Sequence, residues 1–150
     1  MSTKGADEGF EARVRASFAR QRVMESIGAT LTRVEPGAIE IALLYRADLT
    51  QQHGFIHAGI VATILDSACG YAAFSQMPAD RAVLTVEYKI NLLRPAKGDR
   101  LIARARVVRS GKTLTVCAGD AFAETGGAET AVATMLATVM AVEQHDDLRQ

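Results

Sequence analysis

The sequence has little cysteine, no excess charge of either sign and no long uncharged apolar segment. Its 150 residues include only two cysteines, Cys69 and Cys117, and both lie in apolar stretches. So few cysteines cannot form the disulfide framework of a small secreted protein, and we expect both thiols to be buried and reduced. The sequence therefore predicts a cytoplasmic protein of one domain that is stabilised by a hydrophobic core.

The charges balance, and no basic cluster stands out. The chain has 17 Lys and Arg residues and 17 Asp and Glu residues. Because a nucleic-acid surface requires concentrated positive charge, we expect no nucleic acid partner. The N-terminus has no apolar signal-peptide core. The longest apolar stretch, residues 57–77, carries Asp66 near its middle, so we expect a buried helix there and no membrane span.

Residues 57–77 are the predicted centre of the fold. Apolar side chains such as Val61, Leu65 and Ile64 would lie on most sides of a helix drawn over this stretch. A helix that is apolar almost all round is surrounded by the rest of the protein. Asp66 is its only Asp, Glu, Lys or Arg residue, and His57 stands where it should begin. A charge in apolar surroundings is costly unless it is paired or has a task.

The other elements follow from residue periodicity and turn signals. We predict a charged helix over residues 7–27, two short strands within 29–45 joined by Pro36–Gly37, and strands over 82–93, 100–109, 113–124 and 129–142. In strand 82–93, Tyr88 and its apolar neighbours would take one face, and Thr85 and Glu87 the other. Strands and helices do not alternate, so we expect an α+β fold in which an antiparallel sheet of about six strands wraps around the central helix.

This pattern divides the chain into three parts. Residues 1–27 are an N-terminal helical extension with a covering role, residues 28–142 are the main domain, and residues 143–150 are a polar tail that we expect to be flexible.

Residues 51–59 gather groups that could assist attack on an ester or thioester. Gln51 and Gln52 carry amide donors, and Ala58 and Gly59 supply N–H groups of the first helical turn, which no helical carbonyl can accept. A helix N-terminus of this kind stabilises an oxygen that gains negative charge. Gly59 would let a ligand approach closely.

Asp66 cannot act on the same small group as the start of its own helix. It lies nine residues after His57, which corresponds to about 13.5 Å of helical rise. If the carboxylate and the helix start act together, the carboxylate must come from a second copy of the chain. We therefore predict a two-fold symmetric homodimer that pairs through strand 82–93.

Two motifs identify a family. The first is Gln51-Gln52-His53-Gly54-Phe55-Ile56-His57-Ala58-Gly59 with Asp66 nine residues after His57, and the second is Val86-Glu87-Tyr88-Lys89-Ile90-Asn91-Leu92-Leu93-Arg94-Pro95-Ala96 followed by Gly98. In this combination and order, residues 28–142 resemble the hotdog-fold acyl-CoA thioesterases of the PaaI type, in the 4-hydroxybenzoyl-CoA thioesterase superfamily. The resemblance implies a hotdog fold and an enzyme that hydrolyses an acyl or aryl-acyl thioester to the free acid and CoA.

The resemblance also implies roles for five residues. Ala58 would donate its N–H to the thioester carbonyl, Gln51 would contact the thioester or orient water, and His57 would hold the loop and the helix start in place. Asp66 would be the catalytic carboxylate, as nucleophile or as general base, and Thr85 would position water. Structural readings remain open for His57 and Thr85, and Gln52 could replace Gln51 as the contact residue.

No metal or redox cofactor is expected, since coenzyme A enters as part of the substrate. Its phosphates require local positive charge. Four basic residues in or beside turns could provide it, and the turn from Arg109 to Lys112 is the first choice: Arg94, Lys97, Arg109 and Lys112. Each could equally be an ordinary solvated turn charge.

Two other functions fit the same fold. A hotdog dehydratase or hydratase is disfavoured because the chain has only three prolines and lacks the proline pattern of that branch. A non-catalytic acyl-CoA-binding protein would not need Asp66. The sequence leaves the acyl group open, since five residues could line its pocket or pack in the core: Phe55, Tyr71, Phe74, Met77 and Tyr88. A dimer could also stack into a homotetramer.

Overall fold

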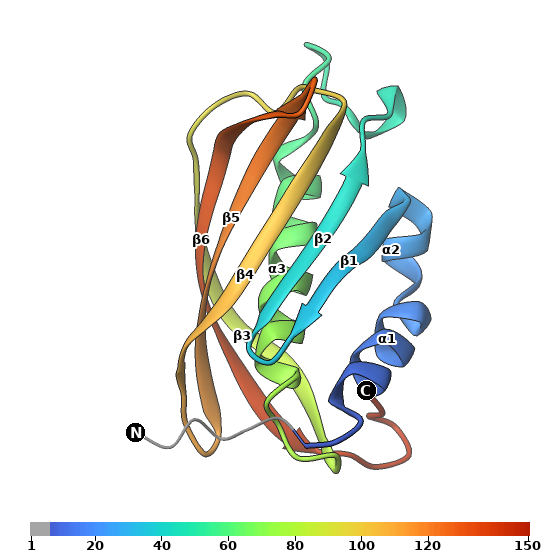
Figure 1. The fold of residues 1–150 in the computed structure, drawn as a ribbon, viewed down its shortest axis with the longest axis vertical. Helices are drawn as coiled ribbons and strands as arrows, with labels where there is room; N and C mark the ends of the chain where they lie inside the picture. Colours follow the sequence, from blue (N-terminus) through green and yellow to red (C-terminus); the bar gives the residue numbers. More distant parts are fainter. Residues whose placement is uncertain (1–6) are drawn as a thin grey trace.

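The computed structural model describes residues 7–150, which form one antiparallel sheet wrapped around a long helix (Figure 1). The strands lie in the order β1-β2-β4-β5-β6-β3, so β1 and β3 are the edges. The helices are α1 (Phe10–Arg20), α2 (Arg22–Ile27) and α3 (Ala58–Phe74), and the strands are β1 (Ala29–Glu35), β2 (Ala38–Leu44), β3 (Arg81–Leu92), β4 (Arg100–Ser110), β5 (Leu114–Thr125) and β6 (Ala128–Glu143). A short 3-10 turn, Ala47–Leu49, follows β2. This confirms the α+β class and the hotdog arrangement.

Helix α3 forms the centre of the core. It packs against β2, β3, β4, β5 and β6, and Ile64, Leu65 and Ala68 are fully buried. Complete burial of a side chain such as Leu65 contributes about 2 kcal/mol, so packing around this helix is a main source of the stability of the fold. The helix ends at Phe74, three residues before the predicted end. No helix within residues 7–150 has the length and apolar character that crossing a membrane requires.

The N-terminal segment forms two helices, so the prediction of one helix over residues 7–27 was wrong. Gln21 adopts an extended backbone (φ −79°, ψ 93°) between α1 and α2. The buried residues explain the break. Val14 of α1 and Ile27 of α2 are both buried, yet in one straight helix they would point about 140° apart. The bend at Gln21 lets both helices bury their apolar faces.

Strand β3 carries a bulge that changes which residues face α3. Thr85 lies opposite the fully buried Val139, whereas Tyr88 lies opposite the fully buried Ala137, and the register shifts between Thr85 and Glu87. Residues opposite each other in an antiparallel pair share a face. Thr85 and Tyr88 therefore both lie on the face toward α3, and the predicted alternation that separated them was wrong. A bulge adds one residue to the strand and so reverses the alternation.

The polar tail, predicted to be flexible, folds back against the N-terminal helices. The Gln150 side chain accepts a hydrogen bond from the Val83 N–H (2.9 Å) and donates one to Ser17 Oγ (3.2 Å). These contacts connect the end of the chain with α1 and β3.

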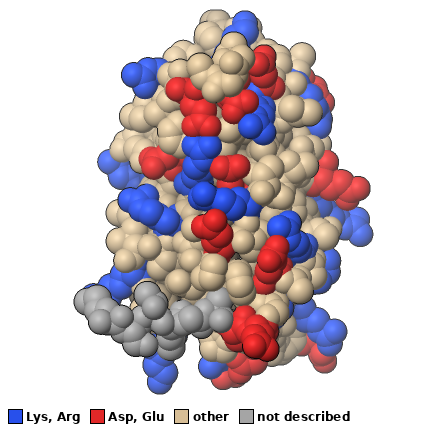
Figure 2. Space-filling view, viewed as in Figure 1, with Lys and Arg blue, Asp and Glu red and all other residues tan. Residues whose placement is uncertain are grey.

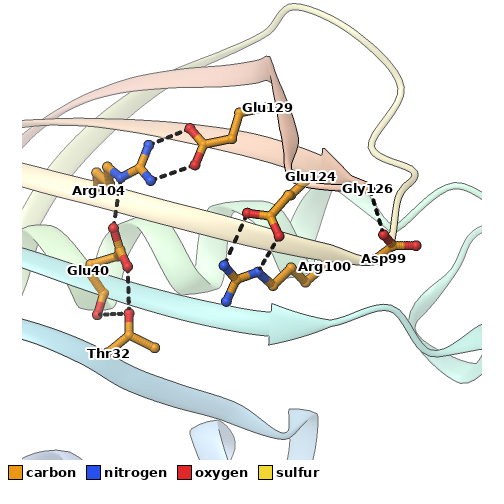
Figure 3. A network of polar contacts seen from close by, with 8 residues as sticks. All are labelled: Thr32, Glu40, Asp99, Arg100, Arg104, Glu124, Gly126 and Glu129. Atoms are coloured by element: carbon orange, nitrogen blue, oxygen red, sulfur yellow. Dashed lines mark hydrogen bonds and ion pairs between the residues drawn. The ribbon is translucent and has the colours of Figure 1, made fainter.

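The outer face of the sheet carries interleaved charges (Figure 2). Arg104 of β4 forms two hydrogen bonds with Glu129 (2.6 and 2.7 Å) and one with Glu40 (2.8 Å), and Arg100 pairs with Glu124 at 3.0 Å (Figure 3). Burial tends to raise the pKa of Glu40, but the bonds from Arg104 and Thr32 lower it overall. This face is a mixed ion-pair network across the strands.

Candidate active site

A pocket of about 450 Å³ opens at the start of α3, and we call it the helix-start pocket. Its residues come from the loop before α3, the first turn of α3, the segment after β3 and one position of β6: Gln51, Phe55, Ile56, Ala58, Val61, Leu92, Leu93, Arg94, Pro95, Ala96 and Val132. Backbone bonds from Ile56 N to the Ala96 carbonyl (2.8 Å) and from His57 N to the Leu49 carbonyl (2.9 Å) hold the loop in place. Both predicted motifs therefore meet at one pocket.

His57 caps the helix. Its Nδ1 accepts a hydrogen bond from the Gly59 N–H at 2.8 Å, so the proton of the neutral ring is on Nε2. A Cβ at position 59 would lie 3.1 Å from His57 Nδ1. Glycine thus favours the close approach of His57, and the Gly59 N–H, which His57 accepts, is not available to a ligand. This geometry supports the structural role considered for His57.

The Ala58 N–H remains as a donor at the helix start. Within residues 7–150 it has no acceptor, and Ala58 lines the helix-start pocket. The first N–H groups of a helix carry a partial positive charge and favour a negatively charged oxygen. A ligand oxygen in this pocket could accept the Ala58 bond.

The structure separates the two candidate glutamines. Gln51 lines the pocket, and its Oε1 accepts a bond from the His53 N–H at 2.5 Å, which leaves the amide nitrogen of Gln51 without a partner in the described chain. Gln52 is exposed, outside the pocket, and its nearest polar partner is His53 Nε2 at 3.5 Å. The arrangement favours Gln51 as the contact residue.

Asp66 lies in a second, smaller pocket of about 80 Å³, which we call the Asp66 pocket. Its lining comes from α3, β3, the α1–α2 junction and the tail: Gln21, Asp66, Ser67, Gly70, Tyr71, Val83, Thr85 and Gln150. Thr85 Oγ1 donates a hydrogen bond to Asp66 Oδ1 at 2.8 Å. Burial raises the pKa of Asp66 above the usual range of an aspartate, and the bond from Thr85 partly opposes this shift. The bulge in β3 is what brings Thr85 to Asp66.

One chain does not bring the two halves together. The helix-start pocket and the Asp66 pocket share no lining residue, and eight residues of α3 between Ala58 and Asp66 correspond to about 12 Å of rise. Within the described chain, β3 pairs with β6 alone, so its other edge is unpaired.

The four basic candidates for binding the CoA phosphates lie at two separate places. Arg94 lines the helix-start pocket, where its Nη1 donates to the Ala131 carbonyl (2.9 Å), and Lys97 is exposed on the same segment. Arg109 and Lys112 lie at the β4–β5 turn, at the opposite end of the molecule from the start of α3 (Figure 1). In the sheet, Arg109 lies opposite Val116 of β5, whereas Ala131, which Arg94 contacts, lies opposite Phe122 of the same strand. Val116 and Phe122 are six residues apart along β5, so the turn is about 20 Å from Arg94. The first-choice turn does not reach this pocket within one chain.

Of the five candidate acyl-contact residues, Phe55 alone lines the helix-start pocket. Tyr71, Phe74 and Met77 are buried in the core, and Tyr88 is exposed on β3. Sequence reasoning missed the apolar lining from Leu92, Leu93 and Val132. The adjacent leucines at the end of a predicted strand were a weak signal for the first two, and Val132 had none. It also missed Gln21 and Gln150 in the Asp66 pocket, because each depends on a contact between segments far apart in the sequence.

Comparisons with known proteins support the resemblance. The thioesterase superfamily model matches residues 53–130. A solved thioesterase family protein from Silicibacter pomeroyi is 55% identical, with a TM-score of 0.89 over 91% of this chain and 100% of that chain. The Escherichia coli PaaI protein, from a phenylacetic acid degradation operon, shares the fold with a TM-score of 0.80 at 20% identity over 92% and 96% of the two chains.

Curated relatives carry esterase and thioesterase names. A protein of Halobacterium salinarum named as an esterase is 35% identical over 118 residues, which are 72% of this chain and 78% of the relative. Acyl-coenzyme A thioesterase 13 of Mus musculus is 28% identical over 109 residues, 71% and 74% of the two chains.

Proposed function

The chain belongs to the thioesterase superfamily and is a thioester hydrolase, and we propose that its substrate is an acyl-CoA, cleaved to the free acid and CoA in a site shared by two subunits. One observation carries the proposal. Within residues 7–150 the N–H of Ala58, which lines an apolar pocket, has no acceptor, whereas Asp66, the carboxylate of α3, lies in a different pocket. The acyl-CoA thioesterase among the curated relatives supports the substrate class.

In the proposed reaction the thioester carbonyl oxygen accepts hydrogen bonds from the Ala58 N–H and the Gln51 amide. These donors stabilise the negative charge that develops as the carbonyl is attacked. Asp66 of the other subunit takes the proton of a water whose oxygen bonds to the carbonyl carbon. The carbon–sulfur bond then breaks, its electron pair leaves with sulfur as the CoA thiolate, and the thiolate takes up a proton.

Asp66 could instead attack the carbonyl carbon directly, giving an anhydride that water then hydrolyses. A single turnover in ¹⁸O-labelled water, run together with hydroxylamine trapping, separates the two routes. Label in Asp66 indicates direct attack with hydrolysis at the Asp66 carboxyl carbon, a trapped hydroxamate indicates the anhydride when water attacks the acyl carbon instead, and the water route gives neither. Both routes use a carboxylate and backbone or amide donors, so they require neither a metal nor a redox cofactor.

The proposed dimer pairs through the free edge of β3. This strand exposes large apolar side chains, with Leu84 45%, Val86 54% and Tyr88 44% exposed. A long apolar edge strand is unfavourable in water and is normally covered by pairing. Pairing of β3 with its two-fold copy would cover the edge and bring the Asp66 pocket of one subunit toward the helix-start pocket of the other. Two such dimers could associate as a homotetramer.

For the CoA phosphates we propose Arg94 and Lys97, which lie at or beside the helix-start pocket, in preference to the more distant turn. We place the enzyme in the cytoplasm, where acyl-CoA is made and where the two free, buried cysteines stay reduced.

The experiment is thiol release from a panel of short, long and aromatic acyl-CoAs, followed with a thiol-reactive dye. We expect turnover of at least one class and none by Asp66→Asn, with acyl-CoA binding by the variant retained. A wild-type protein that binds acyl-CoA but releases no thiol would contradict the proposal and would favour a binding protein.

A further inference from the structure

The α1–α2 junction lies in the Asp66 pocket, although the helical extension was assigned only a covering role. Gln21 is the residue at which the N-terminal segment bends, and its side chain lines the pocket together with Asp66 and Thr85. Its backbone is held on both sides, since Gln21 N donates to the Phe18 carbonyl (3.0 Å) and its own carbonyl accepts from Met24 N (3.0 Å). The bend therefore fixes the backbone position from which the Gln21 side chain extends.

A second contact orients the Gln21 amide. Ser67 Oγ donates to Gln21 Oε1 at 3.1 Å, and Ser67 is the buried residue that follows Asp66 on α3. With the oxygen engaged, the Gln21 amide nitrogen is the free end, and within residues 7–150 it has no acceptor. A donor without a partner is thus held in the pocket that contains the carboxylate.

Further hydrogen bonds hold the segments on the same side of the Asp66 pocket in place. Ser17 Oγ of α1 lies 3.1 Å from the Tyr71 hydroxyl, and Gln150 bridges Ser17 and the Val83 N–H. These contacts dock α1 on α3 and β3 and limit the movement of the junction. A preorganised donor is more effective in catalysis than one that must be ordered during the reaction.

We propose that Gln21 is a positioning residue that holds the hydrolytic water beside Asp66. This rests on the proposed function. The water donates one proton toward Asp66 and accepts a hydrogen bond from the Gln21 amide, which leaves its second lone pair for the carbonyl carbon. Thr85 holds the other carboxylate oxygen, so Thr85 orients the carboxylate and Gln21 orients the water, from segments far apart in the sequence. If Asp66 attacks directly, the same water hydrolyses the anhydride.

The first test is Gln21→Ala. Loss of one hydrogen bond to the reacting water should lower kcat on the order of 10-fold, with KM changed less than about twofold. A kcat within about twofold of the wild-type value would overturn the proposal, and so would a variant that changes KM alone.

The second test is Gln21→Glu, which keeps an acceptor for Ser67 and therefore the fold. It places a second carboxylate in the pocket and should move the acid limb of the kcat profile to higher pH, because a like charge disfavours ionised Asp66. The matched control is Val23→Glu, which adds the same charge at an exposed α2 position outside the pocket. It should leave the acid limb in place.

Other groups around the Asp66 pocket should not shift the acid limb of the kcat profile. Burial raises the pKa of the Cys69 thiol and of the Tyr71 hydroxyl, so both stay protonated at working pH, and Arg20 at the end of α1 is exposed. The side chains of Thr85 and Val83 of β3 and of Gln150 carry no charge.

A readout without substrate separates this proposal from the proposed function. ¹³C NMR titration of the Asp66 carboxyl should show a higher pKa in Gln21→Glu than in Val23→Glu. Equal titrations in the two variants would place Gln21 away from Asp66 and overturn the inference, even if the enzyme proved active. A wild-type protein without thiol release would overturn the proposed function, while this titration would still decide whether Gln21 faces Asp66.

Discussion

Asp66 is a half-buried carboxylate whose surroundings favour its protonated form. Burial raises its pKa, and one hydrogen bond from Thr85 offsets only part of that effect. A group whose pKa is raised in the folded state favours folding most at low pH, where it is protonated in both states. That contribution is lost as pH rises through the folded pKa. Ionisation of this side chain therefore costs more in the folded protein than in the unfolded chain, as expected of a partly buried carboxylate with one hydrogen-bond partner.

The first prediction concerns Asp66→Asn. Turnover should fall by about 1000-fold or more, because a catalytic proton acceptor or nucleophile is lost. Thermal stability at pH 7 should stay equal or rise, and any gain should disappear below about pH 4, where the wild-type carboxyl is protonated as well. Melting temperatures at pH 3.5 and pH 7 provide the measurement.

Asp48→Asn is the matched control. The bond from Arg46 lowers the pKa of Asp48, so its pH dependence should have the opposite sign and be small at this exposed site. A clear loss of stability of Asp66→Asn at neutral pH would show that the carboxylate is a structural group.

At the scale of elements, the start of α3 is built so that one N–H remains free. His57 takes the Gly59 N–H, and Ile60 and Val61 bond the His57 carbonyl. Of the first four helical N–H groups, only that of Ala58, which lines the pocket, has no acceptor within residues 7–150. The loop before the helix is anchored to Leu49 and Ala96. The free donor is thus held by rigid contacts on both sides, as an oxyanion site requires.

The second prediction removes this donor without breaking the helix. Proline fits the first position of a helix because the N–H it lacks has no helical acceptor. His57 already has the extended backbone that precedes proline (φ −57°, ψ 137°). Ala58→Pro should lower kcat about 100-fold or more, with the melting temperature changed only slightly.

Ala58→Gly keeps the N–H and should lose far less activity than Ala58→Pro. Steady-state kinetics of both variants, compared at matched stability, make the test. Equal activity of the proline variant and the wild type would rule out the Ala58 N–H as a donor in the reaction.

At the scale of the whole molecule, the proposed mechanism gives each chain two half-sites. The helix-start pocket and the Asp66 pocket are separated along α3, and the unpaired edge of β3 is the surface through which two copies could bring them together. Each α3 would then supply the N–H donor of one site and the carboxylate of the other. The proposed exchange would account for both the open start and the lone charge of the buried helix.

The third prediction follows from this exchange. Ala58→Pro and Asp66→Asn chains, each inactive alone, should regain activity when co-expressed with different tags and purified as mixed dimers. A mixed dimer has one intact site, so its turnover per dimer should be about half that of the wild type. A verified mixed dimer without activity would indicate that both groups come from one chain.

Much of the fold could be predicted because it depends on local patterns. The turn at Pro36–Gly37 is an example, since Gly37 adopts the positive φ of 72° that this turn requires. The span of α3 and the course of β4, β5 and β6 likewise follow from periodicity and turn residues. The separation of Ala58 and Asp66 also follows from the sequence, because the rise of a helix depends on residue count alone.

Tertiary packing decided the rest. The break at Gln21 and the bulge before Glu87 both interrupt a regular pattern so that side chains on either side can reach the core, and no local signal marks either position. The bulge turns Thr85 toward Asp66, and the break turns Gln21 into the same pocket. The sequence by itself determined the elements and the spacing of the two half-sites, since these depend on neighbours along the chain. Only the tertiary structure decided which side chains surround Asp66, because those contacts join segments that are far apart in the sequence.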